Sequence, residues 1–140
     1  MTNPDKPVGR EQILTPSPVK AKALEKGIDI YTPGRIRENI EFLEKIASYQ
    51  CDYFVVVAYG KILPKVLLDI PRKMCINIHG SILPKYRGAS PIQAALLSGE
   101  KETGVTIIQM SVGMDEGDIL KIRDIPIGRD DTAGTLFETF

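Results

Sequence analysis

The chain has 140 residues, of which 43% are apolar and 26% are charged, and its 18 basic and 18 acidic side chains leave no net charge. This length predicts one domain with enough apolar residues for a core, and the balanced charge gives no global reason to expect a nucleic-acid partner. No apolar run approaches the roughly 20 residues of a membrane-spanning helix, and the polar first residues do not form a signal peptide. We therefore expect a cytoplasmic protein with no membrane partner.

The first part of the chain predicts a loop, a helix and a short strand. Residues 1–16 contain three prolines and are expected to form a loop. Ser17 and Pro18 are typical of the N-cap and first residue of a helix, which Gly27 is expected to end. The segment I-D-I-Y, residues 28–31, is a candidate for a short strand.

The middle of the chain alternates helices and strands. A helix is expected from near Arg35, because apolar residues recur on one face of it up to about residue 47. Residues 52–58 form a β-branched and aromatic run that is typical of a central strand covered on both faces. A helical turn at 65–68 and a strand at 74–79 are expected to follow.

The last part predicts a helix, two strands and a further helix. Ser90 and Pro91 begin the helix, which Gly99 ends, and the two strands, from 105 and 119 onward, are joined through the turn-like M-D-E-G-D. Residues 130–140 open the second helix. The alternation predicts an α/β protein with a largely parallel sheet, whose ligands lie beyond the carboxyl ends of the strands.

Two cysteines, Cys51 and Cys75, both stand among apolar neighbours. This placement predicts buried, reduced thiols in a reducing compartment and argues against a disulfide framework. One histidine and two distant cysteines do not make a convincing zinc site, and D-E-G-D lacks the remaining ligands of a calcium loop. We therefore expect no metal.

His79 is the only histidine, and it ends the apolar run C-I-N-I-H. In a strand, residues i and i+2 point to the same face, so Asn77 and His79 are expected to lie side by side. An amide donor beside an imidazole is suited to polarising a carbonyl and moving a proton. The alternative is a structural histidine that bonds a backbone carbonyl at the strand end. Asp115, in the turn further on, would orient the ring if folding brings it close; otherwise it only faces water.

The stretches N-I-H-G-S-I-L-P-K-Y-R-G-A-S-P-I-Q and E-T-G-V-T-I-I-Q-M-S-V-G-M-D-E-G-D-I-L closely resemble the folate-dependent formyltransferases. Three further segments extend the resemblance to essentially the whole chain: P-D-K-P-V-G-R, T-P-S-P-V-K and V-V-V-A-Y-G-K-I-L-P. They most closely resemble the family members that act on methionyl initiator tRNA. The resemblance implies a Rossmann-like catalytic domain. It also implies transfer of a formyl group from 10-formyltetrahydrofolate to the methionine α-amine.

The resemblance also assigns roles to residues. The family's catalytic asparagine, histidine and aspartate correspond to Asn77, His79 and Asp115. The segment Ser81, Ile82, Leu83 and Pro84 matches the family's folate-binding S-L-L-P, with isoleucine in place of the usual leucine. Residues 58–64 match one wall of the pterin pocket and contribute Tyr59, Gly60, Ile62 and Leu63. The loop at 4–16 matches the segment that reaches the tRNA acceptor stem, with Arg10 at its key basic position and Lys6 beside it.

Length is the main departure from the family. The resemblance implies that the first strand, helix and strand of the family's catalytic domain, the end of that domain and a C-terminal barrel domain lie outside these 140 residues. We therefore expect residues 1–140 to be a partial catalytic domain, incomplete at both ends, of an enzyme that is a monomer when intact. Two other interpretations stay open. One is a formyltransferase for a nucleotide-linked amine such as glycinamide ribonucleotide or an amino sugar, and the other is a non-catalytic remnant.

Overall fold

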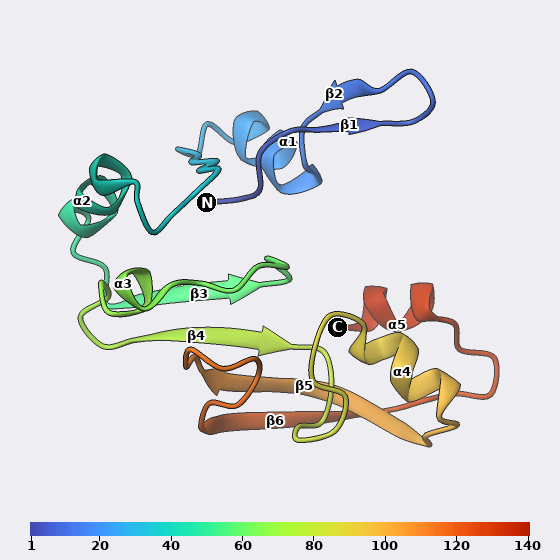
Figure 1. The fold of residues 1–140 in the computed structure, drawn as a ribbon. Coiled ribbons are helices and arrows are strands. Elements are labelled where there is room, and N and C mark those ends of the chain that lie inside the picture. Colours follow the sequence, from blue (N-terminus) through green and yellow to red (C-terminus); the bar gives the residue numbers. More distant parts are fainter. The chain divides into compact units, whose positions relative to one another are not determined.

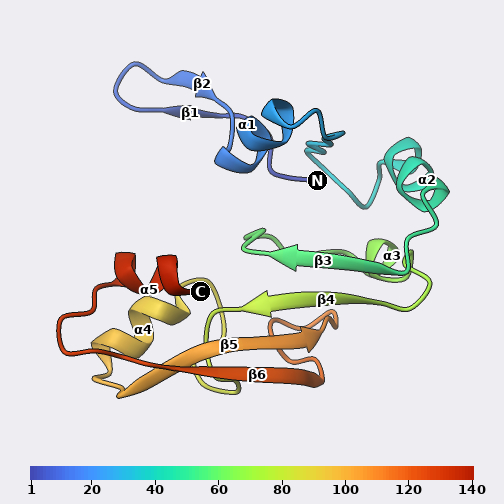
Figure 2. The same cartoon turned by 180° about the vertical axis from the view of Figure 1, so that it is seen from behind.

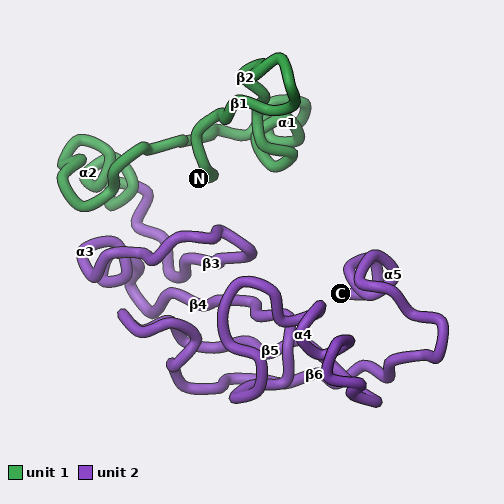
Figure 3. Tube along the Cα trace, turned by 45° about the vertical axis from the view of Figure 1, so that its right-hand side comes forward, with its two compact units in different colours: residues 1–48 green, residues 49–140 purple.

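The computed structural model describes residues 1–140, which divide into two compact units, residues 1–48 and residues 49–140 (Figure 3). None of its helices has the length and apolar character needed to cross a membrane. The residues expected to act in catalysis belong to the second unit, and the residues expected to contact tRNA belong to the first.

The first unit begins with an antiparallel hairpin of β1 (Lys6–Val8) and β2 (Ile13–Thr15) (Figure 1). Gly9 and Gln12 adopt positive φ angles of 73° and 52°, which close the turn between the strands. The prediction of a loop at 1–16 is therefore wrong. Both strands are three residues long and exposed, so no alternation of buried and exposed residues marks them in the sequence.

Two helices follow in the first unit. The helix predicted after Ser17 is confirmed as α1 (Pro18–Glu25), and the Ser17 hydroxyl accepts the Lys20 N–H at 3.1 Å. The predicted strand at 28–31 is wrong, because this segment has no regular structure. The next helix, α2 (Ile40–Ser48), begins five residues later than predicted. Its start is set by Asn39, whose side chain accepts the Phe42 N–H at 3.1 Å.

The second unit is a four-stranded sheet in the order β3 (Tyr53–Val57), β4 (Met74–His79), β5 (Glu102–Gln109), β6 (Ile119–Pro126) (Figures 1 and 2). Helix α3 (Lys65–Leu68) joins the parallel strands β3 and β4. Helices α4 (Pro91–Leu97) and α5 (Ala133–Thr139) lie side by side, and α4 joins β4 to β5. These elements confirm the α/β class and the predicted strands and helices of this part of the chain.

The sheet is less parallel than predicted. Only β3 and β4 are parallel, whereas β4–β5 and β5–β6 are antiparallel. Residues 110–118 between β5 and β6 contain no helix, and the chain folds back there as a hairpin, whereas the connection through α4 brings β5 back antiparallel to β4. The expectation of a largely parallel sheet is therefore wrong for these four strands.

Strand β3 lies at the edge of the sheet, with β4 as its one neighbour. Tyr53, Val55 and Val57 are 45%, 59% and 59% exposed, whereas the residues between them are half-buried. The prediction of a central strand covered on both faces is thus wrong for this structure. An apolar run cannot tell a doubly covered strand from an edge strand with an apolar outer face.

The core of the second unit is made of side chains from the sheet and from α3, α4 and α5. Its most buried members are Leu67, Cys75, Ala95, Ile108 and Leu136. Two polar side chains, Ser81 and Thr106, are also fully buried. They lie next to the carboxyl end of β4, so the buried core extends to His79, the last residue of that strand.

The two cysteines are both free thiols, but they are not equally buried. Cys75 is 3% exposed, and its thiol donates to the Leu68 carbonyl at 3.5 Å. Burial, with a smaller contribution from Asp69, raises the pKa of Cys75 to about 11. Cys51 is half-buried, which corrects the expectation that both thiols are buried.

We expect iodoacetamide at pH 8 to alkylate Cys51 well before Cys75 in the folded chain. The thiolate is the reactive form, and at this pH Cys75 is both protonated and covered. Mass spectrometry of tryptic peptides at successive times measures the two rates in one sample, and Cys51 serves as the internal control. Equal rates at both positions under native conditions would contradict the burial described here.

Candidate active site

The candidate site lies at the carboxyl end of β4. Strands β3 and β4 run parallel with Val57 beside Ile78, so the segments that follow them leave the sheet at the same edge. His79 is the last residue of β4 and is 5% exposed. A ligand site beyond the strand ends is the general rule for open α/β sheets.

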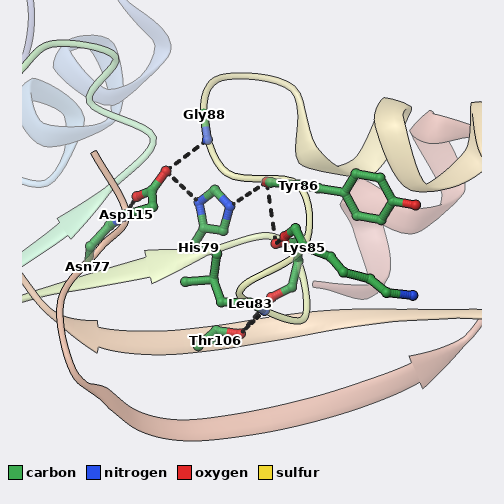
Figure 4. A network of polar contacts seen from close by, with 9 residues as sticks. Asn77, His79, Leu83, Lys85, Tyr86, Gly88, Thr106 and Asp115 are labelled. Atoms are coloured by element: carbon green, nitrogen blue, oxygen red, sulfur yellow. Dashed lines mark hydrogen bonds and ion pairs between the residues drawn. The ribbon is translucent and has the colours of Figure 1, made fainter. Parts of the chain in front are cut away.

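Asn77, His79 and Asp115 meet at this edge (Figure 4). The Asn77 amide donates to Oδ1 of Asp115 at 3.2 Å, and Nδ1 of His79 lies 3.5 Å from Oδ2 of the same carboxylate. The side chains of His79 and Asp115 are 6% and 12% exposed. The structure therefore brings together the three residues that the sequence singled out, including the aspartate whose approach spacing alone does not predict.

The second ring nitrogen of His79 is also engaged. Nε2 lies 2.9 Å from the backbone carbonyl of Tyr86. Because a carbonyl can only accept, Nε2 must carry a proton. Nδ1 then faces the Asp115 carboxylate, another acceptor. A ring that carries protons on both nitrogens donates to both neighbours, whereas the neutral Nε2–H form donates to the Tyr86 carbonyl alone.

Asp115 is held in place by its own backbone and by the opposite loop. It adopts a positive φ of 51° in the turn between β5 and β6. The Gly88 N–H donates to its Oδ2 at 2.9 Å. Two residues later, Gly117 packs so closely on the Gln109 carbonyl that no Cβ can be accommodated there. The turn is thereby fixed against the end of β5, and it presents the carboxylate to β4.

The loop that follows His79 is braced by buried hydroxyl groups. Thr106 donates to the Ser81 carbonyl at 2.6 Å and accepts the Leu83 N–H at 3.1 Å. The Ser81 hydroxyl donates to the Lys85 carbonyl at 2.7 Å. The Leu83–Pro84 peptide bond is cis. These contacts hold the loop against β5 beside the candidate site.

Sequence reasoning missed three groups of this network: the Thr106 hydroxyl, the Tyr86 carbonyl and the Gly88 N–H. Thr106 left one usable signal, because it is a polar residue inside the apolar run V-T-I-I. The other two are backbone groups. Since every residue carries a carbonyl, no residue type at position 86 or 88 marks these contacts in advance.

The residues matched to folate binding fall into two sets. Ser81, Leu83 and Leu63 are 0%, 5% and 3% exposed, so their side chains belong to the core. Ile62 is 69% exposed, Pro84 and Gly60 are exposed, and Ile82 and Tyr59 are half-buried. Burial raises the pKa of the Tyr59 hydroxyl, which is therefore protonated at neutral pH. The second set is the part of the two segments that a ligand could reach.

The residues matched to tRNA binding lie on the hairpin of the first unit. Lys6 is in β1, paired with Thr15, and Arg10 is in the turn. Both are exposed, as are the apolar residues Val8, Ile13 and Leu14. Across the chain, no group of three or more histidine, cysteine, aspartate or glutamate side chains is placed to hold a metal ion.

Comparison with known proteins gives consistent matches. The family model described as formyl transferase matches residues 1–140. A methionyl-tRNA formyltransferase of Lysinibacillus sphaericus (strain C3-41) is 54% identical over 138 residues, which cover 99% of this chain and 44% of that protein. The chain thus spans less than half the length of this curated relative.

Solved structures show the same fold. A phosphoribosylglycinamide formyltransferase from Bacillus halodurans is 28% identical and has a TM-score of 0.75. The match covers 86% of this chain and 66% of the solved chain. A formyltetrahydrofolate deformylase from Pseudomonas syringae pv. tomato is 25% identical and has a TM-score of 0.72. The match covers 86% of this chain and 42% of the solved chain. With a family model that matches all 140 residues, the chain belongs to the formyl transferase family.

Proposed function

We propose that the intact protein transfers the formyl group of 10-formyltetrahydrofolate to the α-amine of methionine on initiator tRNA. The observation that carries this proposal is the convergence of Asn77 and His79 on the two oxygens of Asp115 at the end of β4. In acyl transfer from a carbonyl to an amine, an amide and an imidazole can donate to the developing oxyanion and a carboxylate can accept the proton of the amine.

The reaction begins when the neutral amine nitrogen attacks the formyl carbon. A C–N bond forms, and the carbonyl electrons move to oxygen. The Asn77 amide has two N–H groups and uses one on Asp115, so the other is available to the developing oxyanion. The Nδ1–Oδ2 separation of 3.5 Å is long for a hydrogen bond. A doubly protonated His79 ring, held by the Tyr86 carbonyl, can therefore share its Nδ1–H between Asp115 and the oxyanion.

Asp115 completes the transfer of the proton. The attacking nitrogen becomes positively charged and gives its proton to the carboxylate. When the tetrahedral intermediate collapses, the bond between the formyl carbon and N10 of the folate breaks, and N10 takes up the proton as it leaves. The products are the formylated amine and tetrahydrofolate. No metal or redox partner is needed to balance these steps.

The choice of acceptor rests on similarity and on the hairpin. The named methionyl-tRNA formyltransferase is 54% identical, whereas the phosphoribosylglycinamide formyltransferase of known structure is 28% identical. The hairpin β1–β2 presents Lys6 and Arg10 with exposed apolar side chains. Positive and apolar groups on one projecting element suit a contact with a phosphate backbone and the bases beside it.

Three parallel reactions test the proposal, two with a candidate amine acceptor and one with water alone as the acceptor. The intact protein and 10-formyltetrahydrofolate are mixed with methionyl initiator tRNA, with glycinamide ribonucleotide, or with buffer alone. We expect kcat/KM for the tRNA to exceed that for the nucleotide by at least about 10²-fold, a difference of about 3 kcal/mol in transition-state binding. Faster transfer to the nucleotide, or release of formate in buffer alone, would assign the protein to another branch of the family.

Replacing Arg10 with glutamate is expected to raise KM for the tRNA about tenfold, with kcat and KM for the folate little changed. The side chain is exposed in the turn of the hairpin and would lose one phosphate contact. Loss of such a contact also lowers the salt dependence of log KM by about one unit of slope. Arg37→Glu, at another exposed arginine of the first unit, is the matched control. An equal effect of both changes would contradict a specific role for Arg10.

A further inference from the structure

The orientation of His79 depends on a backbone carbonyl, and that carbonyl has an unusual setting. The Tyr86 carbonyl accepts the Nε2–H of His79 at 2.9 Å. Tyr86 itself adopts a positive φ of 57°, a conformation that non-glycine residues rarely take without support from their surroundings. The position of the ring therefore depends on whatever holds residue 86 in this conformation.

Glu100 provides such support from outside the site. Its Oε1 accepts the Tyr86 hydroxyl at 2.7 Å and the Lys85 ammonium at 2.9 Å. Two consecutive residues of the loop are therefore attached to one carboxylate oxygen. In Figure 4 the side chain of Tyr86 points away from His79 while its carbonyl points toward the ring. The residue is thus held at both ends.

Glu100 is itself well anchored. It follows the end of α4, where its backbone N–H donates to the Ala95 carbonyl at 3.2 Å, and Ala95 is fully buried. The hydrogen bonds from Lys85 and then Tyr86 lower the pKa of Glu100, so the carboxylate is charged at neutral pH. On acidification the two bonds weaken as the pH falls through this lowered pKa.

We propose that Glu100 is a positioning residue for His79, acting through the Tyr86 side chain and carbonyl. It fixes residues 85 and 86 so that the Tyr86 carbonyl stays against Nε2 and directs Nδ1 toward Asp115. The hydrogen bonds of Glu100 go to Lys85 and Tyr86. Its contribution to catalysis rests on the proposed function of the site, but its effect on the ring does not.

The first test observes the ring directly. In a long-range ¹H–¹⁵N spectrum of the ¹⁵N-histidine-labelled intact protein, the signals that disappear in His79→Gln belong to this ring, the one histidine of residues 1–140. We expect the parent protein to show Nε2–H in its neutral form. Glu100→Ala and Tyr86→Phe are expected to shift both ring nitrogens toward a mixture of tautomers. Glu138→Ala is the matched control, because Glu138 is an exposed glutamate of α5 in the same unit.

The second test is kinetic and uses the same variants in the intact protein. Glu100→Ala and Tyr86→Phe are expected to lower kcat about tenfold with KM values within a factor of two, because small displacements of a catalytic group reduce rate more than binding. The double variant is expected to be no worse than Glu100→Ala alone, since that variant has already lost the hydrogen bond between Tyr86 and Glu100. Glu100→Gln, which keeps the shape, covers the case in which the alanine variant does not fold.

The outcomes separate the two proposals. Unchanged ring signals in folded Glu100→Ala overturn the positioning role, whatever the activity. A changed spectrum together with unchanged kcat also overturns it as a contribution to catalysis. If the parent protein transfers no formyl group at all, the proposed function fails, while the spectrum still decides whether Glu100 orients His79.

Discussion

Asp115→Asn and His79→Ala are each expected to lower kcat for formyl transfer by about 10² to 10³ or more, because the first removes the proton acceptor and the second removes a donor to the developing oxyanion. Asparagine keeps the size of Asp115 but cannot accept the proton from the attacking amine. Alanine at 79 removes the ring that the Tyr86 carbonyl and Asp115 hold between them. Initial rates with saturating folate and tRNA measure the effect.

Asp118→Asn is the matched control for the aspartate. It lies in the same connection between β5 and β6, makes the same chemical change and is exposed. We expect its kcat to stay within a factor of two of the parent value. The contrary result is near-normal turnover of an Asp115→Asn variant whose unfolding temperature equals that of the parent protein. It would show that Asp115 does not accept the amine proton, and the proposed mechanism would then have no proton acceptor.

Gly117→Ala is expected to have the second largest effect. A Cβ at this position would collide with the Gln109 carbonyl at the end of β5. Neither partner is a flexible side chain, so the turn between β5 and β6 must move. Overpacking of this kind costs on the order of 1–3 kcal/mol in stability. The same shift displaces Asp115, for which a misplacement of about 1 Å can lower the rate about 10²-fold.

The control for this change is Gly134→Ala in helix α5. A Cβ there meets only the Thr132 side chain at 3.6 Å, an ordinary contact. Alanine is the better helix former, so this variant is expected to be more stable by roughly 0.5–1 kcal/mol. Urea unfolding and initial rates are measured for both variants. A Gly117→Ala protein with parent stability and activity would show that Gly117 does not set the position of Asp115.

Local chemistry explains which elements could be predicted from the sequence. Ser17 and Pro18 fix the start of α1 because a capping hydroxyl and a proline act within one turn of the helix. The short hairpin at residues 6–15 has no such local signal, since its exposed strands contribute no buried alternation. The antiparallel directions of β5 and β6 also could not be predicted from local sequence. Strand pairing depends on where the chain returns after a turn or a helix.

The site shows the same division. Asn77 and His79 are two residues apart on one strand, so their common face follows from strand geometry. The approach of Asp115 depends on the β5–β6 turn and on the close packing of Gly117, which no spacing rule supplies. The structure confirms that His79 bonds a backbone carbonyl, whereas its catalytic role stays a prediction. The ring bonds a backbone carbonyl on one side and faces the aspartate on the other.

The central claim is that this site passes a formyl group from a reduced folate to an amine. Its most direct test is a single-turnover experiment with the intact protein in excess over 10-formyltetrahydrofolate and with methionyl initiator tRNA present. Formyl-methionine and tetrahydrofolate are measured at the same time points. We expect the two products to appear together in equal amounts. Tetrahydrofolate released with free formate, or no turnover of a folded protein that binds both substrates, would contradict the claim.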